Sequence, residues 1–332
     1  MLTAPAAPAQ RSSFIARHLA RHLTRPRGAW VQREDAAMGT AIRVELWSED
    51  NRQGEAAAAA VLAEMHRIDR AMSPHKIGSE LSLINREAPR RAVPLSEEMA
   101  LLIGRALEYA QLSEGAFDIS YAAVGQLYDY RRHQRPDAAA LAAARECVGW
   151  RQLEFDRARG TLRFARAGMR IDLGGFAKGH AVDCAAALLR RRGIAHAWVS
   201  AGGDSRVIGD RRGRPWSVAI RDPRREGEAV AVLPLEDVSI STSGDYERYF
   251  DAEGQRCHHI IDPATGVSPQ GVRSVTILAE DGLAAEAWSK TVFVHGVERG
   301  MALIAAQRGV DAVVVDGDGR LHASAELLHA GG

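Results

Sequence analysis

The chain has 332 residues, of which 26% are charged and 46% hydrophobic, and its formal net charge is +1 at neutral pH. This composition is typical of a globular protein, and the near-zero charge gives no electrostatic case for nucleic-acid binding. No stretch of about 18 apolar residues predicts a transmembrane helix, and three cysteines without a CxxC pair argue against a zinc site or a disulfide framework.

The first 33 residues contain six arginines and no acidic residue. We expect residues 1–33 to form a basic, disordered arm ahead of one domain that spans residues 34–325. Residues 14–23 could also form a helix for a membrane surface or a partner, since their apolar residues fall on one face. A secretory signal needs a continuous apolar stretch of about 7–15 residues, and this segment has none. A misplaced start or an atypical export signal is therefore the third alternative.

Helical periodicity and capping residues predict several helices, at 54–73, 79–86, 96–115, 137–149, 179–192, 283–296 and 298–307. Alternating or β-branched runs predict strands at 38–47, 151–156, 161–165, 197–201, 215–221, 229–235, 238–243, 274–279 and 312–316. Because helices do not regularly separate the strands, the sequence predicts an α+β fold with mixed or antiparallel sheets flanked by helices.

Three glycine-containing segments follow predicted strands, at 172–179 (DLGGFAKG), 200–209 and 241–250. Glycine lets a backbone approach a ligand closely, and a helix start offers free N–H groups to an anion. We expect these loops to meet at one rim, with Lys178 near a phosphate. The competing interpretation is that Gly–Asp is a common turn pair and that each loop is only a turn.

The segment 258–266 (HHIIDPATG) places a histidine before an apolar turn, so His259 is a candidate general base, with Asp245 and Asp262 as alternatives. The motifs MGT (38–40), SELSLINR (79–86), FDIS (117–120), DLGGFAKGHAVD (172–183), AGGD (201–204), TSGDYERYF (242–250), HIIDPATG (259–266) and AEAWSKTVFVHG (285–296) occur in this order. Over roughly residues 35–310 this order resembles the ApbE family of flavin transferases.

The resemblance implies an ApbE-like fold and an FAD:protein FMN transferase. Such an enzyme moves FMN from FAD to a threonine or serine hydroxyl of a target flavoprotein, releases AMP and uses Mg²⁺. It implies that the FAD site includes Met38, His75, Ala116, Phe117, Asp118, Asp172, Lys178 and Ile261. His259 would accept the proton of the attacking hydroxyl, and Gly175, Glu286 and Lys290 hold the family's metal positions.

Two of those metal positions depart from the family's Asp and Thr, since they hold Glu286 and Lys290. A protonated lysine cannot ligate a hard cation, so we expect Mg²⁺ to bind weakly or to be replaced by Lys290. The alternative is an ordinary surface pair of Glu286 and Lys290, worth about 0.2–0.5 kcal/mol. Two other functions stay open, a Mg²⁺-dependent FAD pyrophosphatase and a catalytically weak FAD-binding protein.

Two features predict different cellular compartments for the protein. The lack of a clear signal peptide favours the cytoplasm, whereas the family is usually exported to the periplasmic face. We expect FAD and a target flavoprotein as partners, without nucleic acid and without a membrane span.

Overall fold

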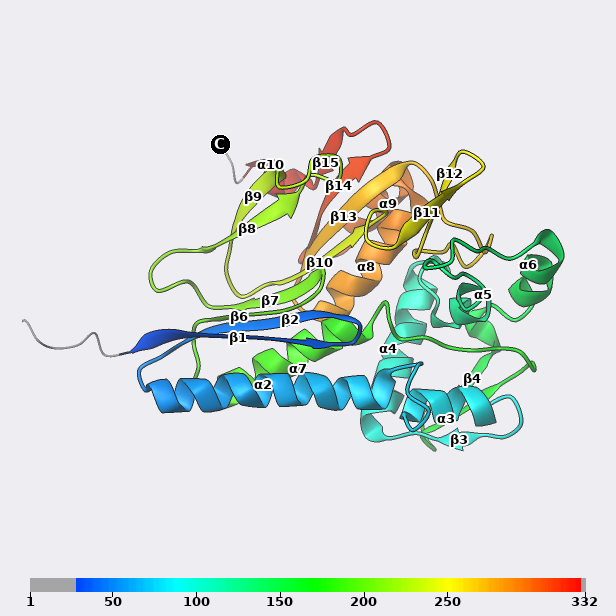
Figure 1. Cartoon of the computed structure of the whole chain (residues 1–332), viewed down its shortest axis with the longest axis horizontal. Coiled ribbons are helices and arrows are strands. Elements are labelled where there is room, and N and C mark those ends of the chain that lie inside the picture. Colours follow the sequence, from blue (N-terminus) through cyan, green and yellow to red (C-terminus); the bar gives the residue numbers. More distant parts are fainter. Residues whose placement is uncertain (1–27, 330–332) are drawn as a thin grey trace, which may run out of the picture.

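A computed structural model describes residues 28–329 of the chain. An eight-stranded antiparallel sheet forms its centre, in the order β1-β2-β6-β7-β10-β13-β14-β15 (Figure 1). Its strands are β1 (Ala29–Ala37), β2 (Thr40–Ser48), β6 (Ala197–Ala201), β7 (Asp204–Ile208), β10 (Ser239–Gly244), β13 (Val272–Ala279), β14 (Val310–Asp316) and β15 (Leu321–Ala323).

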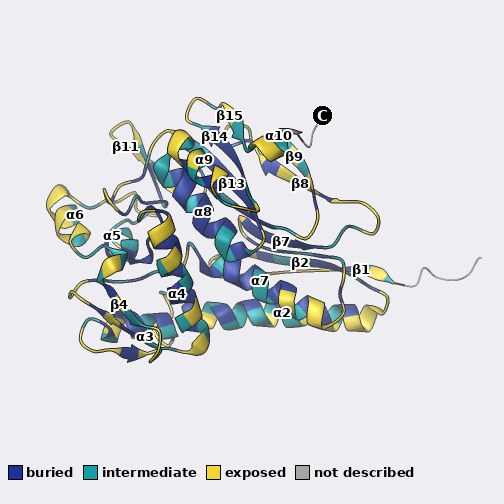
Figure 2. Cartoon of the chain, turned by 180° about the vertical axis from the view of Figure 1, so that it is seen from behind, coloured by how far each residue is buried: buried dark blue, intermediate teal, exposed yellow. Residues whose placement is uncertain are grey.

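Four helices cover one face of this sheet, and they are α2 (Asn51–Met72), α7 (Ala177–Arg191), α8 (Gly282–His295) and α9 (Val297–Ala305). α2 packs on β1 and β2, α7 on β6 and β7, α8 on β10 and β13, and α9 on β14. The core lies between these layers, where the side chains are mostly buried (Figure 2).

α2 shows why the sequence folds this way. The carboxylate of Asp50 caps its first turn by accepting the Arg52 N–H at 2.8 Å. Val61, Met65, Ile68 and Met72 follow at helical spacing and are buried against the sheet. Local capping and apolar periodicity thus agree on one helix with one buried face.

The other elements lie around one end of the sheet and over its edge (Figure 1). They are the sheet β3 (Val93–Pro94), β5 (Thr161–Phe164) and β4 (Leu153–Asp156), the hairpins β8 (Trp216–Arg221) with β9 (Ala229–Leu235) and β11 (Tyr249–Ala252) with β12 (Gln255–His258), and the helices α3 (Glu80–Glu87), α4 (Glu97–Leu112), α5 (Ala122–Gly125), α6 (Ala138–Arg145) and α10 (Ala325–His329). Short 3₁₀ turns cover Ile119–Tyr121 and Trp150–Gln152.

The expected α+β class with antiparallel sheets is confirmed, and most predicted elements are present within a few residues. The expected arm was drawn too long, because residues 29–33 belong to β1 and pair with β2. The rest of that arm, including the possible helix at 14–23, lies outside the described residues. The strands β1, β3, β7, β11, β12 and β15 were not predicted.

None of the helices within residues 28–329 is long and apolar enough to cross a membrane.

Candidate active site

A cavity of about 980 Å³ lies where the central sheet meets the α3–α6 end of the molecule. The residues that the resemblance assigned to FAD all line it, and they are Met38, His75, Ala116, Phe117, Asp118, Asp172, Lys178 and Ile261. His259, Gly175 and Lys290 line it as well. Glu286 lies behind the wall and reaches the cavity through its contacts with lysines.

The three glycine-containing loops meet at this cavity, as the sequence predicted. Gly174, Gly203 and Gly244 all line it. At Gly203 a side chain has no room, because an added Cβ would lie 2.5 Å from the Thr242 carbonyl oxygen. The interpretation of these loops as unrelated turns is therefore wrong.

Met38 occupies a strained position at the rim. It forms the two-residue loop of the β1–β2 hairpin with Gly39, and their φ angles are 53° and 72°. Two residues with positive φ make the turn type that best fits the twist of a hairpin. A methionine rarely adopts this conformation, and such strain concentrates at functional sites. The turn places Met38 against the ligand space.

The carboxylates of Asp118 and Asp172 both bond to backbone N–H groups of nearby turns. Asp118 accepts from Ser120 N at 2.8 Å and from Trp150 N at 2.7 Å. Asp172 accepts from Gly174 N at 2.5 Å. Burial raises the pKa of both carboxyl groups. Both residues line the cavity, and their side chains fix the shape of its wall.

Lys178 stands at the centre of a buried charge network. Its Nζ lies 2.7 Å from Oδ2 of Asp204 and donates to Oε1 of Glu286. The Nζ of Lys290 lies 3.3 Å from the same Glu286 oxygen. The backbone N–H of Gly179 donates to the other oxygen, Oε2, at 2.8 Å. Two ammonium groups and two carboxylates therefore balance one another in the cavity wall.

Sequence reasoning found the Glu286–Lys290 pair but missed Asp204. Glu286 is fully buried, so the alternative of an ordinary surface pair is wrong. Spacing of i and i+4 is the same for a surface pair and a buried one, and Asp204 joins the network from a distant strand. The Gly–Asp pair after a predicted strand was the available signal for Asp204.

The charges in this network depend on one another. Burial by itself would lower the pKa of Lys178, but the carboxylates of Asp204 and Glu286 raise it above its ordinary value. The pKa of Asp204 lies below its ordinary value because Lys178 outweighs burial. Burial lowers the pKa of Lys290, with Glu286 opposing. An anion bound beside Lys290 would therefore favour its charged form.

His259 lines the cavity beside this network. Its Nδ1 is buried and, among the described residues, has no hydrogen-bond partner. Burial, aided by the charge of Lys290, lowers the pKa of His259 to about 3. The imidazole is therefore neutral at physiological pH, and a neutral imidazole has one nitrogen that can accept a proton.

Comparison with known proteins identifies the fold and the family. The family model described as the ApbE family matches residues 38–314. The chain belongs to the ApbE family. It is 33% identical over 315 residues to a Treponema pallidum protein named FAD:protein FMN transferase, covering 89% of this chain and 87% of the relative.

Solved structures agree with this family membership. The ApbE protein of Thermotoga maritima superposes with a TM-score of 0.84 at 32% identity, covering 91% of this chain and 99% of the other. The flavin transferase ApbE of Vibrio cholerae gives a TM-score of 0.79 at 28% identity, with the same coverage. The similarity therefore extends over the whole described domain and includes its cavity.

The metal positions of this ApbE-family chain do not fit a divalent ion. Glu286 has one oxygen on two ammonium groups and the other on a backbone N–H. Lys290 also fills the space toward Gly175, where an added Cβ would lie 3.5 Å from its Cε. Mg²⁺ requires oxygen ligands in near-octahedral geometry, and an ammonium cannot be one. The expectation that Lys290 interferes with the metal position thus agrees with the geometry.

A close helix crossing holds the network together. An added Cβ at Gly179 of α7 would lie 2.3 Å from the Gly282 carbonyl oxygen of α8. Asp183 of α7 accepts the Gly282 N–H at 2.7 Å and so caps the start of α8. Lys178 and Glu286 face each other because these two helices touch by backbone.

We expect Gly179→Ala to destabilise the protein by about 1–3 kcal/mol, because the methyl group must push the two backbones apart. The gain in helix propensity, about 1 kcal/mol, opposes this only in part. Urea unfolding followed by circular dichroism measures the change. Gly175→Ala is the matched control, since its Cβ meets Lys290 at an ordinary 3.5 Å. Equal unfolding midpoints for the two variants would contradict the close crossing.

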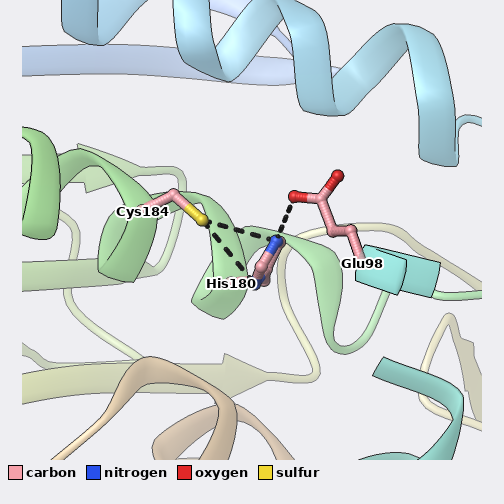
Figure 3. A group of neighbouring side chains, drawn as sticks. All are labelled: Glu98, His180 and Cys184. Atoms are coloured by element: carbon pink, nitrogen blue, oxygen red, sulfur yellow. Dashed lines mark hydrogen bonds and ion pairs between the residues drawn. The ribbon is translucent and has the colours of Figure 1, made fainter. Parts of the chain in front are cut away.

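A second cluster of possible metal ligands lies outside the cavity (Figure 3). Nε2 of His180 lies 2.7 Å from Oε1 of Glu98, and Sγ of Cys184 lies 3.4 Å from the same nitrogen. The guanidinium of Arg67 donates to both Glu98 oxygens, at 2.8 and 2.7 Å. Arg67, aided by His180, lowers the pKa of Glu98 to about 2. Because an arginine already neutralises Glu98, we interpret the cluster as an ion pair that joins α2, α4 and α7.

Proposed function

We propose that this chain is an FAD:protein FMN transferase, which moves FMN from FAD to a hydroxyl group of a target protein. The cavity wall that carries this proposal combines two ammonium groups, on Lys178 and Lys290, with the neutral imidazole of His259. Phosphoryl transfer needs positive charge beside the pyrophosphate and a base for the attacking hydroxyl. The relatives' name, FAD:protein FMN transferase, describes the same reaction.

In the proposed reaction, the hydroxyl oxygen of a threonine or serine of the acceptor attacks the phosphorus of the FMN half of FAD. A new P–O bond forms to the acceptor, and the bond to the bridging oxygen breaks, so that AMP leaves. His259 accepts the hydroxyl proton. The ammonium groups of Lys178 and Lys290 face the negative charge of the pyrophosphate and that of the leaving AMP phosphate.

The cavity is large enough for most of a dinucleotide, since ligand pockets of about 300–1,000 Å³ enclose drug-sized molecules, and this one measures about 980 Å³. The exposed His75 at its rim can stack on a flavin ring, though less well than an aromatic carbocycle.

AMP release tests the proposal and separates it from FAD hydrolysis. The protein is incubated with FAD, with and without an acceptor flavoprotein of one of its relatives, and AMP and free FMN are measured by chromatography. Transfer predicts AMP that rises with acceptor, together with flavin fluorescence on the acceptor band in a denaturing gel. AMP with an equal amount of free FMN, independent of acceptor, would identify a pyrophosphatase instead.

We expect Asp172→Ala to weaken FAD binding at least tenfold, a loss of about 1.4 kcal/mol. The turn at Gly174 loses the carboxylate that fixes it, and the cavity wall loses its shape. Titration of flavin fluorescence measures the affinity. Asp172→Asn keeps a side-chain oxygen for the Gly174 N–H and should retain most of the affinity. Unchanged binding in Asp172→Ala would remove this turn from the FAD site.

A further inference from the structure

The use of lysine in this chain is unusual. Of its 43 basic residues, only Lys76, Lys178 and Lys290 are lysines, and all others are arginines. Two of the three lysines meet at a single buried carboxylate, that of Glu286. An ammonium is a compact point charge on a flexible stem, whereas a guanidinium is a flat fork that needs more room. The site therefore contains two of the three compact ammonium groups in a chain whose other basic side chains, apart from Lys76, are guanidinium groups.

The network positions both ammonium groups toward the ligand. The side chains of Lys178 and Lys290 are 22% and 19% exposed and line the cavity, whereas those of Asp204 and Glu286 are 4% and 0% exposed. The Glu286 carboxylate lies behind both lysines, outside the cavity lining, whereas Asp204 lines the cavity wall beside Lys178. Each ammonium has three N–H donors, so donors remain for a bound anion.

The same geometry disfavours a divalent ion at this place. Two unit charges about 4 Å apart interact by about 4 kcal/mol at an effective dielectric constant of 20, and a doubly charged ion doubles that repulsion for each ammonium. Asp204 cannot serve as a substitute ligand, because its oxygens are bonded to Lys178 at 2.7 Å and to Ser241 at 2.6 Å. A metal ion would have to break the whole network to bind.

We infer that this chain carries its own cation for the FAD pyrophosphate: the ammonium groups of Lys178 and Lys290, held by Asp204 and Glu286, take the place of a divalent metal ion. The inference rests on the proposed function and adds that FAD binds without a metal ion. A lysine fixes phosphate oxygens less rigidly than a metal ion does, so the site gives up some positional control.

The first test uses the unmodified protein. FAD affinity is measured by flavin fluorescence in EDTA and in millimolar Mg²⁺, and Mn²⁺ binding is measured separately by electron paramagnetic resonance. We expect the same FAD affinity in both buffers and no Mn²⁺ binding below the millimolar range. A tenfold loss of FAD affinity in EDTA, or Mn²⁺ binding at micromolar concentration, would overturn the inference.

The second test converts the site. Lys290→Thr combined with Glu286→Asp introduces the residue types usual for the family. We expect this double variant to bind Mn²⁺, to lose at least tenfold in FAD affinity in EDTA, and to recover it with Mg²⁺. Its Mg²⁺-dependent AMP release should exceed that of the unmodified protein several-fold. If the double variant gains neither Mn²⁺ binding nor a Mg²⁺ response, Lys290 does not replace a metal.

Lys76→Thr is the matched control, because it makes the same substitution at the exposed third lysine, which pairs with Asp69. It should leave FAD affinity in EDTA unchanged. The FAD-affinity and Mn²⁺-binding readouts do not depend on turnover. A protein that binds FAD without metal but releases no AMP would keep this inference and contradict the proposed transferase, so the two failures are distinguishable.

Discussion

We expect replacement of His259 by alanine to slow AMP release from FAD by about 10²–10⁴, the range typical of a general base, and to leave FAD affinity nearly unchanged. His259 lines the cavity beside Lys290, and its ring is neutral because its pKa is lowered to about 3. A pyrophosphate bound nearby would raise that pKa and make the imidazole a stronger base. Single-turnover kinetics and a fluorescence titration measure the two quantities separately.

The pH dependence gives an independent check of the same residue. A histidine of ordinary pKa would cause kcat/KM to fall as pH drops through about 6.5. His259 stays neutral in the free enzyme down to about pH 3. Its titration should therefore cause no fall in kcat/KM between pH 8 and pH 5. A His259→Ala variant that retains most of its activity would exclude His259 as the base.

The alternative bases considered from the sequence have other partners. Asp245 pairs with Arg273 at 3.3 Å, and Asp262 accepts from Ala264 N at 2.8 Å. Neither lines the cavity. His258 is buried with its Nε2 on the Pro269 carbonyl oxygen at 2.9 Å. His259 is therefore the best-placed base among these four residues.

The second large effect is expected from Lys178→Met, which should lower the free energy of unfolding by about 3–5 kcal/mol and abolish measurable FAD binding. Removing one partner of a buried ion pair leaves an uncompensated charge in the interior. That charge is Asp204, whose remaining partner is the hydroxyl of Ser241. Glu286 keeps Lys290, so the loss is concentrated at Asp204.

Adding Asp204→Asn to Lys178→Met removes the unpaired charge and should restore part of the lost stability, a coupling that a double-mutant cycle measures. Urea unfolding of the unmodified protein, the two single variants and the double variant supplies the four values needed. If the effects of the single variants simply add, Lys178 and Asp204 are not coupled and the network does not hold the site.

The sequence predicted those parts of the fold that local chemistry determines. α2 was expected at 54–73 and lies at Asn51–Met72, because its apolar spacing and its cap both act within the segment. β1, Ala29–Ala37, was not predicted, because most of its residues are exposed and three of them are charged, as in many edge strands. Its strand state comes from pairing with β2.

The site also has a part that the sequence predicted and a part that it did not. The resemblance to the ApbE family assigned Met38, Asp172, Lys178 and His259 to one site, and all four line one cavity. The burial of Glu286 and its contact with Asp204 could not be read from the sequence, because they depend on the crossing of α7 and α8 and on a distant strand. Long-range packing, rather than spacing, decides whether an i,i+4 pair is a surface pair or part of a site.

The most direct measurement of the central proposal is the intact mass of an acceptor flavoprotein after incubation with this chain and FAD. The proposed transferase predicts a mass gain of one FMN less one water on the acceptor, equimolar AMP in solution, and no gain when the acceptor threonine or serine is replaced by valine or alanine. An acceptor of unchanged mass, while FAD is split into free FMN and AMP or is left intact, would contradict it.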